Sequence, residues 1–182
     1  MKNKQWSLPL MGKVFDALRK GRHICHDDGE LFLALRDNKD EYEELFTNLG
    51  FNFREHRRGF FFFEGESQLG EIAERMAVFM FILIEDISTR GIPVEEALMT
   101  RLFDPGELPH FQGERSRQYM KQVGISGPDD LSNLLKRMEM YGFMKVQPNG
   151  SFRFRTPVCR FLELCTEFID EADDMKVEDR DE

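Results

Sequence analysis

Four side chains with metal-binding or catalytic potential lie close together near the N-terminus: His23, Cys25, His26 and Asp27. A zinc site needs about four converging ligands. On an extended segment, successive side chains point to opposite sides, so His26 would point away from His23 and Cys25. Cys159 and Cys165 supply no second pair, because a spacing of six on a helix separates them by roughly 240°. The sequence therefore predicts no metal site.

The residue patterns of common catalytic sites are absent from the sequence. There is no GxSxG turn for a nucleophilic serine, and neither GxxxxGK[ST] nor GxGxxG is present to cradle a phosphate. Carboxylates are abundant, but they fall mainly on predicted helix faces and in the C-terminal tail, where solvation explains them. The sequence predicts a protein that is not an enzyme and that needs no cofactor.

Basic residues are concentrated between residues 113 and 156, where eight basic side chains stand against four acidic ones. The candidate DNA contacts in this segment are Arg115, Arg117, Lys121, Lys136, Arg137, Arg153 and Arg155. Arg153 and Arg155 alternate with apolar residues on a predicted strand, from which they could contact phosphates. Asp129 and Asp130 open the preceding helix, where a recognition helix usually contacts bases. We expect non-specific DNA contact or, equally, an ordinary solvated surface.

The first third of the chain predicts helices and a hairpin in a definite order. The predicted helices span 10–20, 30–36 and 40–49, with an extended stretch at 22–25 and two hairpin strands at 51–54 and 60–63. Helix, short strand, two helices and hairpin is the order of a winged helix, a helix-turn-helix core followed by a β-hairpin.

A similar order follows later in the chain. Helices are predicted at 68–89, 94–103, 114–123 and 128–141, a loop at 104–113, strands at 143–146 and 152–156, and a last helix from Pro157. The predicted fold is mainly α with small antiparallel β-hairpins (α+β), arranged as tandem winged-helix domains. The domains span 1–66 and 67–172, the second with a closing helix, and an acidic tail spans 173–182.

Charge and hydropathy indicate the surroundings of the protein. Residues 157–182 carry three basic and ten acidic side chains, which is typical of a solvated terminus. The alternative is that this acidic segment acts as an electrostatic decoy for nucleic acid or as a docking peptide for a partner. The longest apolar run, residues 76–84, is too short to span a membrane. Three cysteines form no even disulfide framework, so we expect a cytoplasmic protein.

One stretch is specific enough to suggest a family. Residues 17–24 read ALRKGRHI and resemble the "ALR-x-GRHI" stretch of the MukE family, including its MksE branch. Weaker similarity follows at residues 59–62, 133–143 and 152–161. The residues that match the family motif best are Gly21, Arg22, His23 and Ile24. Members of this family are accessory subunits of bacterial SMC-like condensins.

The resemblance implies more than the residues alone indicate. It implies a tandem winged-helix homodimer that binds a kleisin subunit (MukF- or MksF-like) and, through it, an SMC-like ATPase. It also implies a cytoplasmic, nucleoid-associated role in chromosome condensation and segregation. The short chain favours the MksE branch. The alternative is a winged-helix transcription regulator, which would bind a defined DNA duplex on its own.

Overall fold

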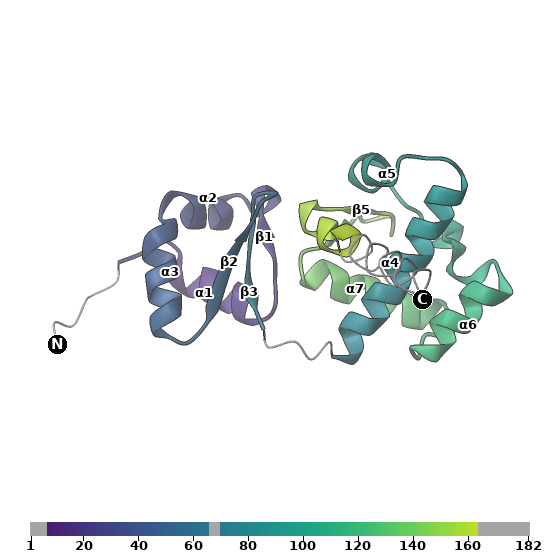
Figure 1. Ribbon diagram of the computed structural model, residues 1–182, viewed down its shortest axis with the longest axis horizontal. Helices are drawn as coiled ribbons and strands as arrows, with labels where there is room; N and C mark the ends of the chain where they lie inside the picture. Colours follow the sequence, from purple (N-terminus) through teal and green to yellow (C-terminus); the bar gives the residue numbers. More distant parts are fainter. Residues whose placement is uncertain (1–6, 66–69, 164–182) are drawn as a thin grey trace, which may run out of the picture.

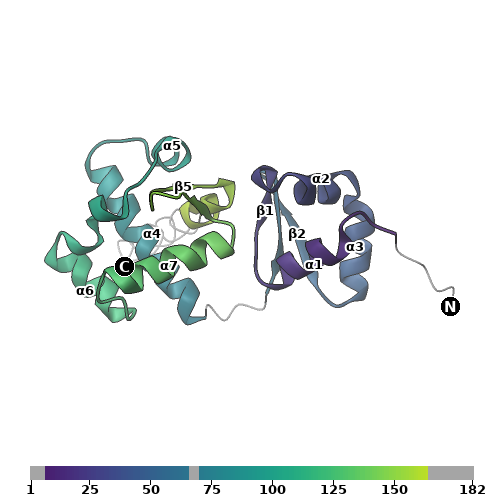
Figure 2. The same ribbon diagram turned by 180° about the vertical axis from the view of Figure 1, so that it is seen from behind.

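The computed structural model describes residues 7–65 and 70–163. These residues are mostly helical and carry two small antiparallel sheets, in agreement with the predicted α+β class. The elements form two groups, one on each side of residues 66–69 (Figures 1 and 2). Each group encloses its own hydrophobic cluster, drawn from residues 14–61 and 76–161. We call residues 7–65 the N-terminal module and residues 70–163 the C-terminal module.

The N-terminal module contains every helix and strand predicted for it, with bounds that differ by at most two residues. Its elements are α1 (Met11–Arg19), β1 (Ile24–Cys25), the 3₁₀ turn η1 (His26–Asp28), α2 (Glu30–Asp37), α3 (Lys39–Asn48), β2 (Asn52–His56) and β3 (Phe60–Glu64). The strands form one antiparallel sheet in the order β1-β3-β2. Helices α1, α2 and α3 bury Val14, Leu35 and Phe46 in the shared cluster.

Strand β3 is buried on both faces. Phe61 lies in the cluster of the N-terminal module, where its ring centroid is 5.6 Å from that of Phe53 on β2. Phe60 and Phe62 point to the other face and form a second buried group with Cys25 of β1. A continuous apolar run is typical of strands covered on both faces. The C-terminal module supplies this second cover, since the guanidinium carbon of Arg160 lies 4.3 Å from the Phe62 ring centroid.

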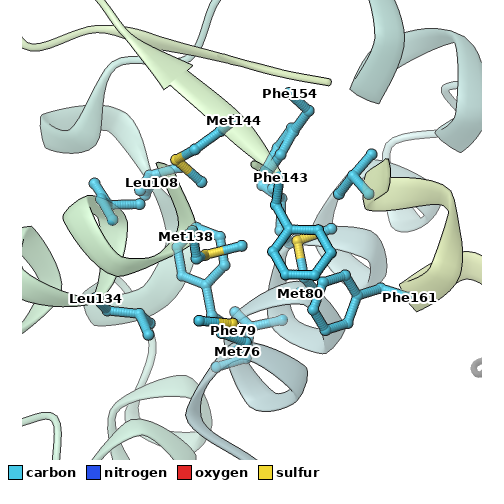
Figure 3. Packing of buried hydrophobic residues seen from close by; sticks show 14 of the residues in the cluster. Met76, Phe79, Met80, Leu108, Leu134, Met138, Phe143, Met144, Phe154 and Phe161 are labelled. Atoms are coloured by element: carbon cyan, nitrogen blue, oxygen red, sulfur yellow. The ribbon is translucent and has the colours of Figure 1, made fainter. Parts of the chain in front are cut away.

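The C-terminal module is larger and mainly helical. Its elements are α4 (Glu71–Thr89), α5 (Val94–Thr100), η2 (Pro105–Glu107), η3 (Pro109–Phe111), α6 (Glu114–Gln122), α7 (Pro128–Met140), β4 (Met144–Val146), β5 (Phe152–Phe154) and η4 (Thr156–Val158). Figure 3 shows the core, in which Phe79 and Met80 of α4 face Met138 of α7 and Phe143 beside the hairpin. The unbranched methionines fill the irregular space between the aromatic rings.

Helix α5 is shorter than the sequence indicates. The prediction extended it to residue 103, but it ends at Thr100. Phe103 instead pairs with Phe152 of β5 through two backbone hydrogen bonds of 2.8 and 2.9 Å. The two rings also stack, with centroids 5.5 Å apart. Ring burial and backbone pairing with the hairpin therefore outweigh three further residues of helix, because tertiary contacts override local helix propensity.

The predicted loop at 104–113 contains the 3₁₀ turns η2 and η3 and is anchored by a buried histidine. His110 is fully buried, and its Nε2 donates a 2.8 Å hydrogen bond to the carbonyl oxygen of Phe79. The imidazole stacks on the Phe79 ring at 4.2 Å. Burial lowers the pKa of His110 to about 4, so the ring is neutral near pH 7. This histidine fixes the loop on α4.

The predicted closing helix begins where the sequence indicated. Pro157 lies in the turn η4, and residues 159–163 continue as helix. The rest of the predicted closing helix, the acidic tail at 173–182 and the predicted boundary at residue 66 lie outside the described residues, so they stay predictions. Within 7–65 and 70–163, no helix is both long and apolar enough to cross a membrane.

Candidate functional site

The Gly21-Arg22-His23-Ile24 stretch connects α1 to β1 and lies against the C-terminal end of α7. The backbone N–H of His23 donates a 2.9 Å hydrogen bond to the carbonyl oxygen of Tyr141. Gly21 has φ +82°, and a Cβ there would lie 2.9 Å from Cε1 of Tyr141. Glycine is therefore required both for its backbone conformation and for the close approach of the tyrosine ring.

The His23 side chain is enclosed by residues of both modules. Its Nδ1 lies 3.3 Å from the Tyr141 carbonyl oxygen, and its Nε2 lies 2.7 Å from Nη1 of Arg160. The ring centroids of Phe62 and Phe143 lie 5.3 and 4.6 Å away. Burial, together with the Arg160 charge, lowers the pKa of His23 to about 3. These partners fit a neutral tautomer in which Nδ1 donates to the carbonyl and Nε2 accepts from the guanidinium.

Asp28 is the anion shared by the two modules. Its Oδ1 accepts a 2.7 Å hydrogen bond from Nη2 of Arg22, and its Oδ2 accepts hydrogen bonds from the Cys25 N–H at 3.0 Å and from Nη2 of Arg155. Burial alone would raise the pKa of Asp28. The hydrogen bonds from Arg22 and the Cys25 N–H and the charge of Arg155 outweigh it and hold that pKa below its ordinary value.

Arg155 is buried between the modules, although the sequence predicted it as a DNA contact. It is 6% exposed, its Nε lies 3.3 Å from a carboxylate oxygen of Asp27, and its Nη1 lies 3.4 Å from the carbonyl oxygen of Gly142. Arg153, two residues earlier, is exposed. The burial of Arg155 removes it from the candidate DNA contacts, because the N-terminal module covers the end of the strand.

The tip of the β2-β3 hairpin also contacts the C-terminal module. Glu163 accepts hydrogen bonds from His56 at 2.8 Å and from Arg57 at 2.7 Å. Arg58 forms an ion pair with Glu95 of α5. This hairpin tip therefore holds the neighbouring module and does not present free cations to a nucleic acid.

The other candidate cations are exposed and differ in their partners. Arg115 pairs with Glu85 at 3.0 Å, and Arg117 pairs with Glu114 at 3.3 Å. Among the described residues, no carboxylate lies within 4 Å of the cationic groups of Lys121, Lys136, Arg137 and Arg153. Arg153 stands directly opposite Lys145 in the β4-β5 register, and both are exposed. Like charges directly opposite destabilise a hairpin, so an anion would stabilise this pair.

An apolar groove lies beside α7. It has a volume of about 540 Å³ and is bounded by η2, η3, α7 as far as Lys136, and the β4-β5 hairpin. The residues that line this α7 groove are Pro105, Gly106, Leu108, Phe111, Gln112, Pro128, Leu131, Ser132, Leu135, Lys136, Val146 and Gly150. Nothing in the sequence had indicated it, because residues distant in sequence form its walls.

Comparison with known proteins decides the family. The family model for the condensin complex protein MksE matches residues 9–166, which include both modules. The chain belongs to the MksE family. Among curated proteins, no sequence matches significantly. The predicted MukE/MksE resemblance is thereby confirmed, and the chain is a condensin complex subunit.

Three potential metal ligands of this MksE-family chain lie closer together than predicted. Ligand atoms of Cys25, His26 and Asp27 all lie within 4.8 Å of one another. The prediction that His26 points away was wrong, because residues 26–28 form a 3₁₀ turn and not an extended strand. However, Nη2 of Arg155 lies 3.2 Å from the Cys25 sulfur, and burial raises the pKa of that thiol. A protonated thiol beside a guanidinium is a poor cation ligand, so we assign the cluster to the contact between modules.

The sequence singled out the Gly21–Ile24 stretch as the most specific part of the family resemblance, but it did not indicate which residues this stretch contacts. Asp28, Tyr141 and Arg160 had not been singled out. The signal that could have indicated them is the uninterrupted run of four phenylalanines at 60–63, since a strand buried on both faces needs a second covering surface.

Proposed function

We propose that this MksE-family chain is a non-catalytic subunit of a MukBEF- or MksBEF-like condensin that binds the kleisin and supports chromosome condensation and segregation. The family match over residues 9–166 carries this proposal. In the proposed assembly the chain is a homodimer, reaches the SMC-like ATPase through the kleisin, and works at the nucleoid in the cytoplasm.

The proposed tandem winged-helix organisation is supported by the order of the elements. In the N-terminal module, α1, β1, α2 and α3 precede the β2-β3 hairpin, and β1 flanks β3. In the C-terminal module, α6 and α7 precede the β4-β5 hairpin, and Phe103 flanks β5 in the same way. The proposed domains are 1–66 and 67–172, followed by the tail at 173–182.

We propose the α7 groove as the kleisin-binding surface. Peptide-binding grooves are mostly apolar and take the apolar anchors of a partner segment. The α7 groove fits this description, because Leu108, Phe111 and Leu131 line it. At the start of α7, Asp129 and Asp130 are exposed, which disfavours approach of DNA phosphates and leaves this face to a protein partner.

Ser132→Arg is expected to weaken kleisin binding at least about tenfold, which corresponds to about 1.4 kcal/mol of binding free energy. Blocking an apolar hot-spot contact typically costs more than this. Ser132 is exposed and lines the α7 groove. A long charged side chain there fills the groove without removing any core residue. Calorimetric titration of the purified kleisin into the full chain measures the change.

Asn133→Arg is the matched control. Asn133 is also exposed on α7, but it lines a separate polar hollow with Arg75 and Arg137. The same charge is introduced one residue further along the helix, and kleisin affinity is expected to stay within about twofold of the unmodified chain, as for near-neutral surface positions. Equal affinities of both variants for the kleisin would rule out the α7 groove as its binding surface.

We propose a second, weaker contact, in which Arg153 and Lys145 of the hairpin bind DNA phosphates without reading sequence. Arg153→Ala is expected to weaken DNA binding by the assembled complex for all sequences alike. Loss of one phosphate contact lowers the slope of log affinity against log salt by about 1. Fluorescence anisotropy over a range of salt concentrations measures both quantities.

Arg36→Ala is the control for the DNA measurement, because Arg36 is exposed on α2 and already paired with Asp37 at 2.8 Å. An unchanged slope of log affinity against log salt for Arg153→Ala would show that the β4-β5 hairpin does not contact DNA. Tight binding of the isolated chain to one defined duplex would instead support the alternative of a transcription regulator.

A further inference from the structure

The face of the N-terminal sheet that carries Cys25, Phe60 and Phe62 is not a solvent surface. All three side chains are buried, at 0%, 0% and 8% exposure. The C-terminal module covers them through Arg155 at Cys25 and Arg160 at Phe62. In Figures 1 and 2, β1 and β3 form the side of the N-terminal module that faces β5. The modules therefore share a buried contact as well as a connecting segment.

One end of this contact is built around a single carboxylate. Asp28 binds Arg22 of its own module and Arg155 of the other, and its side chain is 6% exposed. Arg22 also reaches across the contact, with Nη1 3.4 Å from the Met140 carbonyl oxygen. While the modules touch, loss of the Asp28 charge would leave the buried Arg155 with only the exposed Asp27 as a counterion, which is unfavourable. Separation of the modules here would break the Asp28–Arg155 pair.

A hydrogen bond between a neutral histidine and a buried arginine lies beside this ion pair. Arg160 donates to Nε2 of His23 and stacks over the Phe62 ring. The His23 backbone N–H is bonded to Tyr141. Because this hydrogen bond joins the backbones of the two modules, it fixes the register of the Gly21–Ile24 stretch on the end of α7.

The other end of the contact is the hairpin tip. There His56 and Arg57 bind Glu163, and Arg58 binds Glu95. The two contact sets lie on opposite sides of β3, because Cys25 of β1 and His56 of β2 both pair with Phe60. Contacts on both sides of the strand restrain rotation as well as separation, which one contact set would not do.

We infer that residues 21–28 and the β2-β3 hairpin tip form an interlock that holds the two modules as one rigid body, with Asp28 as the anion that both modules share. The inference is independent of kleisin binding. It assigns a role to the most specific sequence motif of the chain: Gly21 admits Tyr141, Arg22 orients Asp28, and His23 bonds to α7. The N-terminal module then keeps a fixed position relative to the α7 groove and the β4-β5 hairpin of the C-terminal module.

Asp28→Asn tests the interlock, because it keeps the shape of the side chain and removes its charge. Cys25 reports on opening, since its thiol is buried only while the modules touch at Arg155. The rate at which a disulfide reagent modifies Cys25 in the folded full chain is expected to rise at least about tenfold, because breaking a buried ion pair raises the population of the open form. Mass spectrometry of digested peptides identifies Cys25 as the labelled residue.

Asp16→Asn is the matched control, because Asp16 forms exposed ion pairs with Arg19 and Lys20 within α1. The Cys25 labelling rate is expected to be unchanged in this variant. An unchanged rate in Asp28→Asn with a native circular dichroism spectrum would overturn the inference.

Hydrogen exchange in the unmodified chain tests the interlock without any variant, should Asp28→Asn fail to fold. The His23 amide is hydrogen-bonded across the contact. If this contact and the neighbouring strand open together, the exchange rates of the His23 and Phe61 amides are expected to agree within about tenfold. A His23 amide that exchanges at least about a hundredfold faster would show that the modules separate while each remains folded, and would overturn the inference.

Discussion

Gly142→Ala is expected to lower the free energy of unfolding by about 3 kcal/mol, because two costs combine at one position. Gly142 has φ +84°, in the left-handed region that side chains other than glycine rarely adopt. A Cβ there would also overlap the backbone carbonyl oxygen of His23, which cannot move away like a flexible side chain. The substitution strains the turn that follows α7 and displaces the Gly21–Ile24 stretch from its contact with this turn. Urea denaturation measures the change.

Gly150→Ala separates the two costs. Gly150 has φ +87°, and a Cβ there would meet no atom within 4 Å. This variant carries only the backbone cost, about 1 kcal/mol for a non-glycine residue in the left-handed region. Equal losses of stability in the two variants would contradict the close approach of α7 to His23. If Gly142→Ala loses more stability than Gly150→Ala, the difference of about 2 kcal/mol is the cost of the overlap with His23 at the contact between the modules.

Local patterns in the sequence were sufficient to predict most of the helices and strands. Apolar residues at helical spacing indicated α1, α3 and α7, and the glycines after them indicated where each helix ends. The hairpins were recognisable from phenylalanines that alternate at 51–53 and 152–154 and form a continuous run at 60–63. Where the prediction failed, a contact distant in sequence decides: Phe103 leaves a helical pattern because Phe152 offers it a backbone partner.

The candidate site was harder to predict than the fold. Period-two alternation placed Arg153 and Arg155 on one strand, but β5 ends at Phe154, directly before Arg155. The alternation also could not indicate that β1 and η1 of the other module cover only the second of these arginines. Local pattern also failed at His26, whose orientation depends on a 3₁₀ turn closed by Asp28. The Arg155 error arises because its ion pair with Asp28 joins residues more than a hundred positions apart in the chain, whereas the His26 error arises from a local turn.

Arg155→Ala is expected to cost about 3 to 5 kcal/mol of unfolding free energy, the usual loss when one partner of a buried ion pair is removed. Asp27 and Asp28 would then face a cavity with one cation fewer, and Arg22 would be the one cation left to Asp28, beside the hydrogen bond from the Cys25 N–H. Arg153→Ala is the control, because Arg153 is an exposed arginine of the same hairpin; its loss is expected to stay within about 0.5 kcal/mol. Urea denaturation at pH 7 measures both.

The pH dependence of this difference distinguishes an electrostatic role of Arg155 from simple packing. Because the pKa of Asp28 is lowered on folding, its pairing stabilises the native state above the unfolded-state value of 3.8. That contribution is lost as the pH falls through the still lower folded-state pKa. The gap in stability between the unmodified chain and Arg155→Ala is therefore expected to be full near pH 7 and to narrow below about pH 4. A gap that is constant down to that range would mean that Arg155 stabilises the contact through packing, and that the carboxylate of Asp28 is not what holds the modules together.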